Sequence, residues 1–311
     1  MADNIATREA YGKALAEFGD TYDFVVMDAD LSGSTKTGIF AKKFPNRFIN
    51  CGIAEGNMMA TAAGISTTGK TVFASSFAIF ASGRAFEQIR NSIAYPNLNV
   101  KIGATHAGVS VGEDGASHQA IVDMAIMRSL PNMVVINPAD AVEAKAAVLA
   151  AIEHEGPVYL RLGRLSVPVI FDENDYEFEL GKGKLISDGE DITIFSTGLM
   201  TYESMKAVEM LKSSGISARL VNIHTIKPID RDIIVKAAKE TKNIVTVEEH
   251  SVIGGLGSAV AEVLCEECPC KLTRLGLNDV FGQSGKPYEL LNLYGLTAEH
   301  IANRVKEILD K

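Results

Sequence analysis

The chain contains no tryptophan, only four cysteines and no long apolar run. A membrane-spanning helix needs about 20 consecutive apolar residues, so we expect no transmembrane segment. The first residues, MADNIATREA, lack the charged and then apolar order of a signal peptide, and we expect a cytoplasmic protein. The net charge of −9, without a basic stripe, disfavours nucleic acid as a partner, because it would repel a phosphate backbone.

Three of the four cysteines lie close together, at Cys265, Cys268 and Cys270. Four cysteines are too few for a disulfide scaffold. A structural zinc site needs four ligands, and the remaining cysteine, Cys51, lies far away in the sequence without a nearby histidine. We therefore favour reduced thiols at the end of a helix over a metal site.

The length of 311 residues predicts two domains. In the first half, short apolar strands alternate with helices. The expected elements are strands at Phe24–Met27, Thr71–Phe73, Val100–Thr105 and Met133–Ile136, with helices at Arg8–Phe18 and from about Ala141. This order predicts an α/β fold with a doubly wound, mostly parallel sheet, in which ligands gather beyond the carboxyl ends of the strands.

A second, smaller α/β domain of the same kind is expected in the rest of the chain. The expected elements are strands at Ile192–Ser196, Ala218–Asn222, Asn243–Glu248 and Lys271–Leu275, with helices at Thr201–Ser213, Asp230–Thr241 and Ser258–Cys265. An acidic, glycine-containing stretch without helical periodicity precedes them. We therefore expect domains at 1–168 and 191–311, joined by a linker at 169–190.

Three segments of the first half contain polar or aromatic residues where a strand gives way to a loop or a helix. In GIAEGNM, Glu55 begins a small and apolar helix, although an acidic residue there also complements the helix dipole. In FASSFAIF, Phe77 and Phe80 share one face of a helix start, where core packing is the alternative explanation. The segment THAGVSVGEDGASHQ, which contains His106 and His118, indicates a functional loop, since a histidine can donate hydrogen bonds or charge near neutral pH.

These segments, followed by PVYLRLGR, resemble the pyrimidine-binding half of transketolases, with a more distant likeness to deoxyxylulose-phosphate synthases. The likeness extends over nearly the whole chain and includes EEHSVIGGLG in the second half. The resemblance implies the C-terminal subunit of a split transketolase, with a pyrimidine-binding domain and a C-terminal domain. The implied reaction is transfer of a two-carbon ketol unit from a ketose phosphate to an aldose phosphate, with thiamine diphosphate as cofactor.

The resemblance implies that Glu55 hydrogen-bonds the aminopyrimidine ring of the cofactor. A carboxyl group at a ring nitrogen favours the imino tautomer, which can then take the proton from the thiazolium carbon. Phe77 and Phe80 are implied as the aromatic wall of this pocket, and His118 as a further cofactor contact. Some transketolases have another aromatic residue where this chain has Gly83, so we expect a pocket that is looser or filled by another side chain.

The resemblance also implies a site for the sugar phosphate. The residues implied to bind it are Arg8, Ser34, His106, Asp114, His118 and Arg164. Two arginines, a histidine and a hydroxyl group would clamp the phosphate. Asp114 and His118 would contact the hydroxyl groups and the carbonyl region of the ketose.

The GDG motif through which such enzymes bind magnesium and the cofactor diphosphate does not occur in this sequence. The run Gly254-Gly255-Leu256-Gly257 lacks the GxGxxG spacing of a dinucleotide loop, and we interpret it as a structural turn. We therefore expect no metal ligand in this chain. The resemblance implies a partner, an N-terminal transketolase subunit that binds Mg²⁺ and the diphosphate, in an α2β2 assembly.

Three other functions stay open at this point. A deoxyxylulose-phosphate synthase or another decarboxylating transferase is one, although GED follows His106 where the synthase has an arginine-containing loop. The beta subunit of a 2-oxoacid dehydrogenase is a second, but its version of the long loop differs. The third is a non-catalytic regulatory module, which the intact set of implied site residues disfavours.

Overall fold

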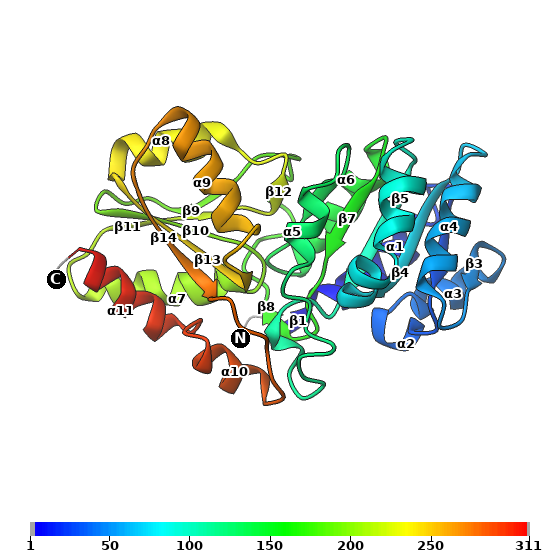
Figure 1. The fold of residues 1–311 in the computed structure, drawn as a ribbon, viewed down its shortest axis with the longest axis horizontal. Coiled ribbons are helices and arrows are strands. Elements are labelled where there is room, and N and C mark those ends of the chain that lie inside the picture. Colours follow the sequence, from blue (N-terminus) through cyan, green and yellow to red (C-terminus); the bar gives the residue numbers. More distant parts are fainter. Residues whose placement is uncertain (1–3, 310–311) are drawn as a thin grey trace.

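The computed structural model describes residues 4–309, which form two mostly parallel sheets with helices packed against them (Figure 1). The first sheet contains β2 (Phe24–Asp28), β3 (Phe48–Asn50), β4 (Thr71–Phe77), β5 (Val100–Thr105), β6 (Val134–Ile136), β7 (Val158–Arg161) and β12 (Thr225–Lys227). Its strand order is β12-β6-β7-β5-β4-β2-β3, and only β12 runs antiparallel to its neighbour.

The second sheet contains β9 (Lys184–Ser187), β10 (Ile192–Ser196), β11 (Ala218–Asn222), β13 (Asn243–Ser251) and β14 (Lys271–Leu277). Its strand order is β14-β13-β10-β11-β9, and β9 is its one antiparallel strand. A separate antiparallel pair joins β1 (Asn4–Ala6) to β8 (Ser166–Pro168). The predicted α/β class with two mostly parallel sheets is confirmed.

The helices of the first half are α1 (Thr7–Phe18), α2 (Ser32–Thr35), α3 (Gly38–Lys43), α4 (Glu55–Ser66), α5 (Asp123–Arg128) and α6 (Ala141–Glu153). Those of the second half are α7 (Met200–Ser213), α8 (Arg231–Thr241), α9 (Leu256–Glu267), α10 (Pro287–Leu293) and α11 (Ala298–Ile308). Short 3₁₀ turns occur at η1 (Pro45–Arg47) and η4 (Val109–Val111), and π-helical turns at η2 (Phe80–Arg84) and η3 (Gln88–Ala94).

Two short strands depart from the expected organisation. β9 lies inside the stretch that the sequence suggested as a linker, and it pairs with β11. β12 follows β11 in the sequence but completes the first sheet beside β6. Both segments are short and end in polar residues, unlike the apolar strand at Val134–Ile136, so the sequence did not indicate them.

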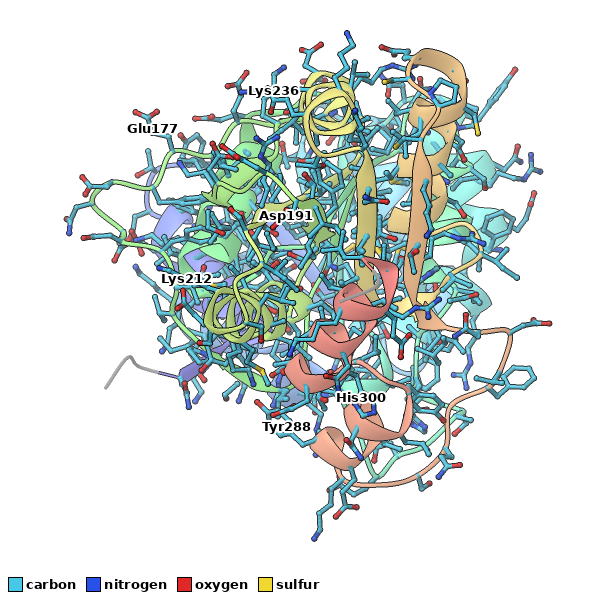
Figure 2. The ribbon with its side chains drawn as sticks, turned by 90° about the vertical axis from the view of Figure 1, so that its left-hand side faces the viewer. Glu177, Asp191, Lys212, Lys236, Tyr288 and His300 are labelled. Carbon is cyan, nitrogen blue, oxygen red and sulfur yellow. The ribbon has the colours of Figure 1, made fainter. Side chains whose placement is uncertain are left out.

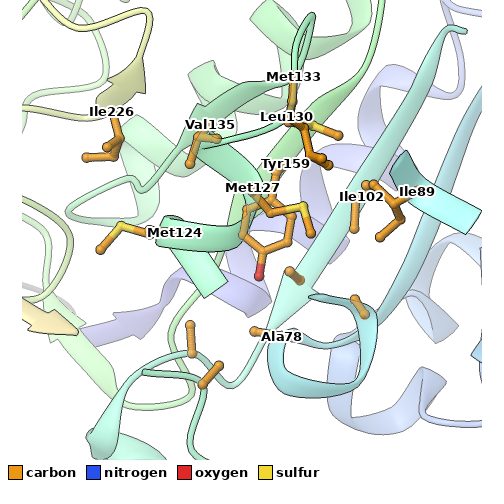
Figure 3. Close-up of a cluster of buried hydrophobic side chains, with 14 of the residues drawn as sticks. Ala78, Ile89, Ile102, Met124, Met127, Leu130, Met133, Val135, Tyr159 and Ile226 are labelled. Carbon is orange, nitrogen blue, oxygen red and sulfur yellow. The ribbon is translucent and has the colours of Figure 1, made fainter. Parts of the chain in front are cut away.

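Side chains from both halves share one apolar core. Met124, Met127 and Tyr159 pack together there, and Ile226 of β12 joins them from the second half of the chain (Figure 3). The cap of α6 also fixes the segment after β8, because Asp140 accepts hydrogen bonds from the N–H groups of Glu143, Ile170 and Phe171. The two halves are therefore joined by packing as well as by the chain.

A buried ion pair lies where the two halves meet. Nε of Arg161 donates to Oδ2 of Asp123 over 2.9 Å, and the hydroxyl group of Tyr159 donates to the same oxygen over 2.9 Å. Nη2 of Arg161 also donates to the carbonyl oxygens of Ala120 and Glu249. The side chains of Arg161 and Asp123 are 2% and 0% exposed, so water screens this pair very little.

The glycine run combines a turn at Gly254 and Gly255 with the first two residues of α9, Leu256 and Gly257. The N–H groups of Leu256 and Gly257 donate to the carboxylate of Glu248 over 2.7 and 2.8 Å. An additional Cβ at Gly255 would lie 2.0 Å from Oε2 of Glu248. The start of this helix is therefore capped by the chain's own carboxylate, close to a glycine that has no room for a side chain.

The end of the molecule formed by α7, α8 and α11 presents polar side chains, including Lys212, Lys236 and His300 (Figure 2). Within residues 4–309, no helix has both the length and the apolar composition needed to cross a bilayer.

Replacement of Asp123 by Asn should lower the free energy of unfolding by about 3–5 kcal/mol, because it removes the carboxylate that pairs directly with the buried Arg161 guanidinium. The matched control is Asp23→Asn, which removes an exposed partner of Lys70 and should leave stability nearly unchanged. Chemical denaturation of both variants measures the difference. Equal effects at the two positions would contradict the role given to the buried pair.

Candidate functional site

Most of the predicted site residues lie along one edge of the first sheet. Glu55 follows β3, and Ser34 follows β2. Phe77 is the last residue of β4, His106 comes directly after β5, and Arg164 follows β7. Because these strands are parallel neighbours, their carboxyl ends bring these residues to the same edge.

Glu55 is the first residue of α4, and its side chain is 5% exposed. Oε1 of Glu55 accepts a hydrogen bond from Nη1 of Arg84 over 3.2 Å. The carboxylate therefore lies at the N-terminus of α4, where the helix dipole favours a negative charge, and it also faces the guanidinium of Arg84. The guanidinium of Arg84 lies 4.3 Å from the centroid of the Phe80 ring, so the carboxylate and the aromatic ring border the same space.

Four aromatic rings form a continuous wall beside this carboxylate. The rings of Phe77 and Phe80 are stacked, with centroids 5.8 Å apart and planes at 22°. His106 stacks on Phe77 with centroids 3.9 Å apart, and His118 meets Phe80 edge-on at 5.3 Å. The alternative of plain core packing does not describe Phe80, because its ring is only partly buried and Arg84 covers it.

A cationic group lies at the His106 end of this wall. Nη1 of Arg8 donates to the main-chain carbonyl oxygen of Ser34 over 2.6 Å. Burial lowers the pKa of Arg8, and the charge of Arg164 lowers it further. Arg164 itself donates to the carbonyl oxygen of Val111 in the long loop. The positive charges of Arg8 and Arg164 are therefore close enough to repel each other. A bound anion would reduce this repulsion.

His106 differs from the sequence-based expectation in one respect. Burial lowers the pKa of His106 to about 3, with further lowering by the charges of Arg8 and Arg164. The ring is therefore neutral near pH 7 and can offer a hydrogen bond but no charge. Nδ1 lies 3.0 Å from the hydroxyl oxygen of Thr105, which leaves Nε2 for a ligand.

The positions of Ser34 and Asp114 differ from the roles that the resemblance implied for their side chains. The carbonyl oxygen of Ser34, rather than its hydroxyl group, accepts from Arg8. Asp114 is exposed in the long loop, and in the described part of the chain it forms no hydrogen bond or ion pair with another predicted site residue. His118 is closer to the wall, where Nδ1 lies 3.0 Å from the Ser117 hydroxyl oxygen.

The sequence did not indicate three residues that the structure adds to the site. Arg84 pairs with Glu55, and only its position four residues after Phe80 could have suggested this contact. The charge of Lys36 also lowers the pKa of His106, after those of the two arginines and His118. Oε2 of Glu249, from the second sheet, accepts from the main-chain N–H of Ser110 in the long loop over 3.1 Å.

The cysteine cluster does not take part in this site. All four cysteines are free thiols, and Cys265 is exposed. Across residues 4–309, no group of three or more histidine, cysteine, aspartate or glutamate side chains is arranged to hold a metal ion.

Comparison with known proteins gives two family matches. The profile of the transketolase pyrimidine binding domain matches residues 3–169, and that of the transketolase C-terminal domain matches residues 181–301. The chain is 56% identical over 308 residues to a provisionally named transketolase C-terminal section from Methanocaldococcus jannaschii, covering 98% of this chain and 96% of that protein.

Two further proteins are similar to this chain over nearly its whole length. A 6-deoxy-6-sulfo-D-fructose transketolase subunit from a Clostridium species is 41% identical over 305 residues, covering 98% of this chain and 94% of that protein. A solved structure described as a split gene transketolase, inactive beta4 tetramer, is 58% identical with a TM-score of 0.92. That match covers 98% of this chain and 99% of the solved chain.

The neutral state of His106 can be tested through stability. The pKa of His106 in the folded chain, about 3, is below the value of about 6.5 in an unfolded chain. The unfolded state therefore binds more protons between these values, and this contribution to stability is lost as the pH falls from about 6.5 towards 3. The unfolding free energy of the wild type, relative to His106→Gln, should decrease over that range. A difference that stays constant or increases on acidification would contradict the assignment.

Proposed function

Because the chain belongs to the transketolase family, we propose that it is the C-terminal subunit of a split transketolase. In this proposal it transfers a two-carbon ketol unit from a ketose phosphate to an aldose phosphate, together with a second subunit. One observation carries the proposal: the buried carboxylate of Glu55 borders a stacked aromatic wall that ends at two arginines. Such a site offers a place for a flat heterocycle beside a place for an anion.

The residues of the wall fit the pyrimidine ring of thiamine diphosphate. Bound thiamine diphosphate would supply the carbon nucleophile that breaks and forms the carbon–carbon bonds of the sugar. Glu55 would hydrogen-bond a nitrogen atom of the ring from its buried position beside the aromatic wall. Phe77 and Phe80 would stack with the ring and exclude water, and His118 would close the same pocket from its edge.

The cationic group would bind the phosphate of the sugar. Arg8 and Arg164 would supply charge, and the neutral ring of His106 would supply a hydrogen bond. Asp114 and His118, which lie on the long loop, would contact hydroxyl groups of the ketose. The similar Clostridium subunit is named for a sulfonated fructose, whose sulfonate is likewise an anionic group.

A partner subunit is part of the proposal. The sequence lacks the GDG motif, so a second chain would bind the cofactor diphosphate and Mg²⁺. Two large apolar side chains that shortly precede Glu55 in the sequence are exposed, Ile53 by 77% and Ile49 by 39%, which favours a protein surface against them. The similar solved structure is described as inactive, as expected of a β chain without its partner. We propose an α2β2 assembly.

Reconstitution tests this function. The purified chain, mixed with the diphosphate-binding chain from the same organism, thiamine diphosphate and Mg²⁺, should convert xylulose 5-phosphate and ribose 5-phosphate to sedoheptulose 7-phosphate. Neither chain alone should do so. Assembly without this product, or product from this chain alone, would count against the proposal.

Replacement of Glu55 by Gln should reduce turnover of the assembled enzyme by at least about 100-fold, because the amide cannot exchange a proton with the ring. Size-exclusion chromatography should show unchanged assembly. Glu87→Gln is the matched control, since Glu87 forms an exposed pair with Arg90. Full activity of the Glu55 variant would remove the acid role from this residue.

A further inference from the structure

Arg84 makes two contacts that the proposed function assigns to the cofactor ring. Nη1 of Arg84 donates to Oε1 of Glu55 over 3.2 Å. The guanidinium carbon of Arg84 lies 4.3 Å from the centroid of the Phe80 ring. One flat, donating group therefore faces the carboxylate and covers the aromatic ring at the same time.

The local backbone explains how Arg84 reaches this place. Phe80 and Arg84 are the first and last residues of η2, a π-helical turn. Between them, Gly83 has no neighbouring atom within 4 Å of the position where a Cβ would stand. The chain has no aromatic side chain at Gly83, and the guanidinium of Arg84 covers the ring of Phe80 instead. The sequence left two possibilities at Gly83, a looser pocket or a pocket filled by another side chain. This arrangement supports the second.

We propose that Arg84 sets the affinity of the chain for thiamine diphosphate by competing with the pyrimidine ring for Glu55 and Phe80. This inference rests on the proposed function. A guanidinium is planar, donates hydrogen bonds to carboxylates and stacks on aromatic faces, as a protonated heterocycle does. Both groups cannot occupy the face of Phe80 beside the carboxylate, so cofactor binding requires Arg84 to move away.

The surroundings of Arg84 allow this movement. Its side chain is 57% exposed, whereas that of Glu55 is 5% exposed. Glu55 is its one ion-pair partner among residues 4–309. Arg161, in contrast, is held by three acceptors in the core. Because the Arg84 side of the pair is open to water and its partial screening, Arg84 should weaken cofactor binding without preventing it.

Calorimetric titration of the assembled two-subunit enzyme with thiamine diphosphate, at saturating Mg²⁺, tests the inference. Arg84→Ala should bind the cofactor about fivefold more tightly than the wild type, the order expected from one partly exposed ion pair and one cation–π contact. The matched control is Arg90→Ala. Arg90 belongs to the next helical turn and pairs with Glu87 at 50% exposure, so its removal should leave the affinity unchanged.

The outcomes separate this inference from the proposed function. Equal or weaker binding by Arg84→Ala, with normal binding by the wild type, would overturn the competition and leave the proposed function in place. No binding by the assembled wild-type enzyme would overturn the proposed function itself. If Arg84→Ala does not assemble, Arg84→Met serves the comparison, because it keeps an unbranched side chain over Phe80 but cannot donate to Glu55. It too should bind more tightly.

Discussion

The carboxyl ends of five parallel strands, β3, β2, β4, β5 and β7, meet along one edge of the first sheet. Parallel strands all point the same way, so every loop that follows them leaves the sheet on the same side. This constraint brings Glu55, Phe77 and His106 together, although they are far apart in the sequence. Arg8 reaches the same edge from α1 through its hydrogen bond to the carbonyl oxygen of Ser34. The chemistry of the site therefore follows from strand direction and order.

The second half of the chain holds the long loop of this site in place. Arg161 joins the carbonyl oxygen of Ala120, at the end of that loop, to the carbonyl oxygen of Glu249. The side chain of Glu249 binds the N–H of Ser110, and an added Cβ at Gly108 would lie 2.2 Å from that carboxylate. These contacts give the C-terminal domain a structural role at the candidate site, because they hold the loop that contains His106 and His118.

The sequence predicted the fold class and the positions of the main strands along the chain because short apolar strands alternate with helices. It also predicted that Glu55 opens a helix and that the rings of Phe77 and Phe80 lie together, since these depend on near neighbours along the chain. The expected shared helix start is corrected, because Phe77 ends β4 and only Phe80 belongs to a helical turn. It could not predict the neutral state of His106, which depends on burial and on two arginines from distant segments. The Arg84 contact was missed for a similar reason: a long side chain can point in many directions, and only the packed structure selects one.

The central claim is that Glu55 and the Phe77–Phe80 wall form a pyrimidine pocket whose other half lies on a partner subunit. A crystal structure of the two-subunit assembly with thiamine diphosphate and Mg²⁺ tests it most directly. The account predicts the pyrimidine ring against Phe80, a ring nitrogen within hydrogen-bonding distance of the Glu55 carboxylate, and the diphosphate held by the partner. A cofactor bound wholly within one chain, or a ring remote from Glu55, would contradict it.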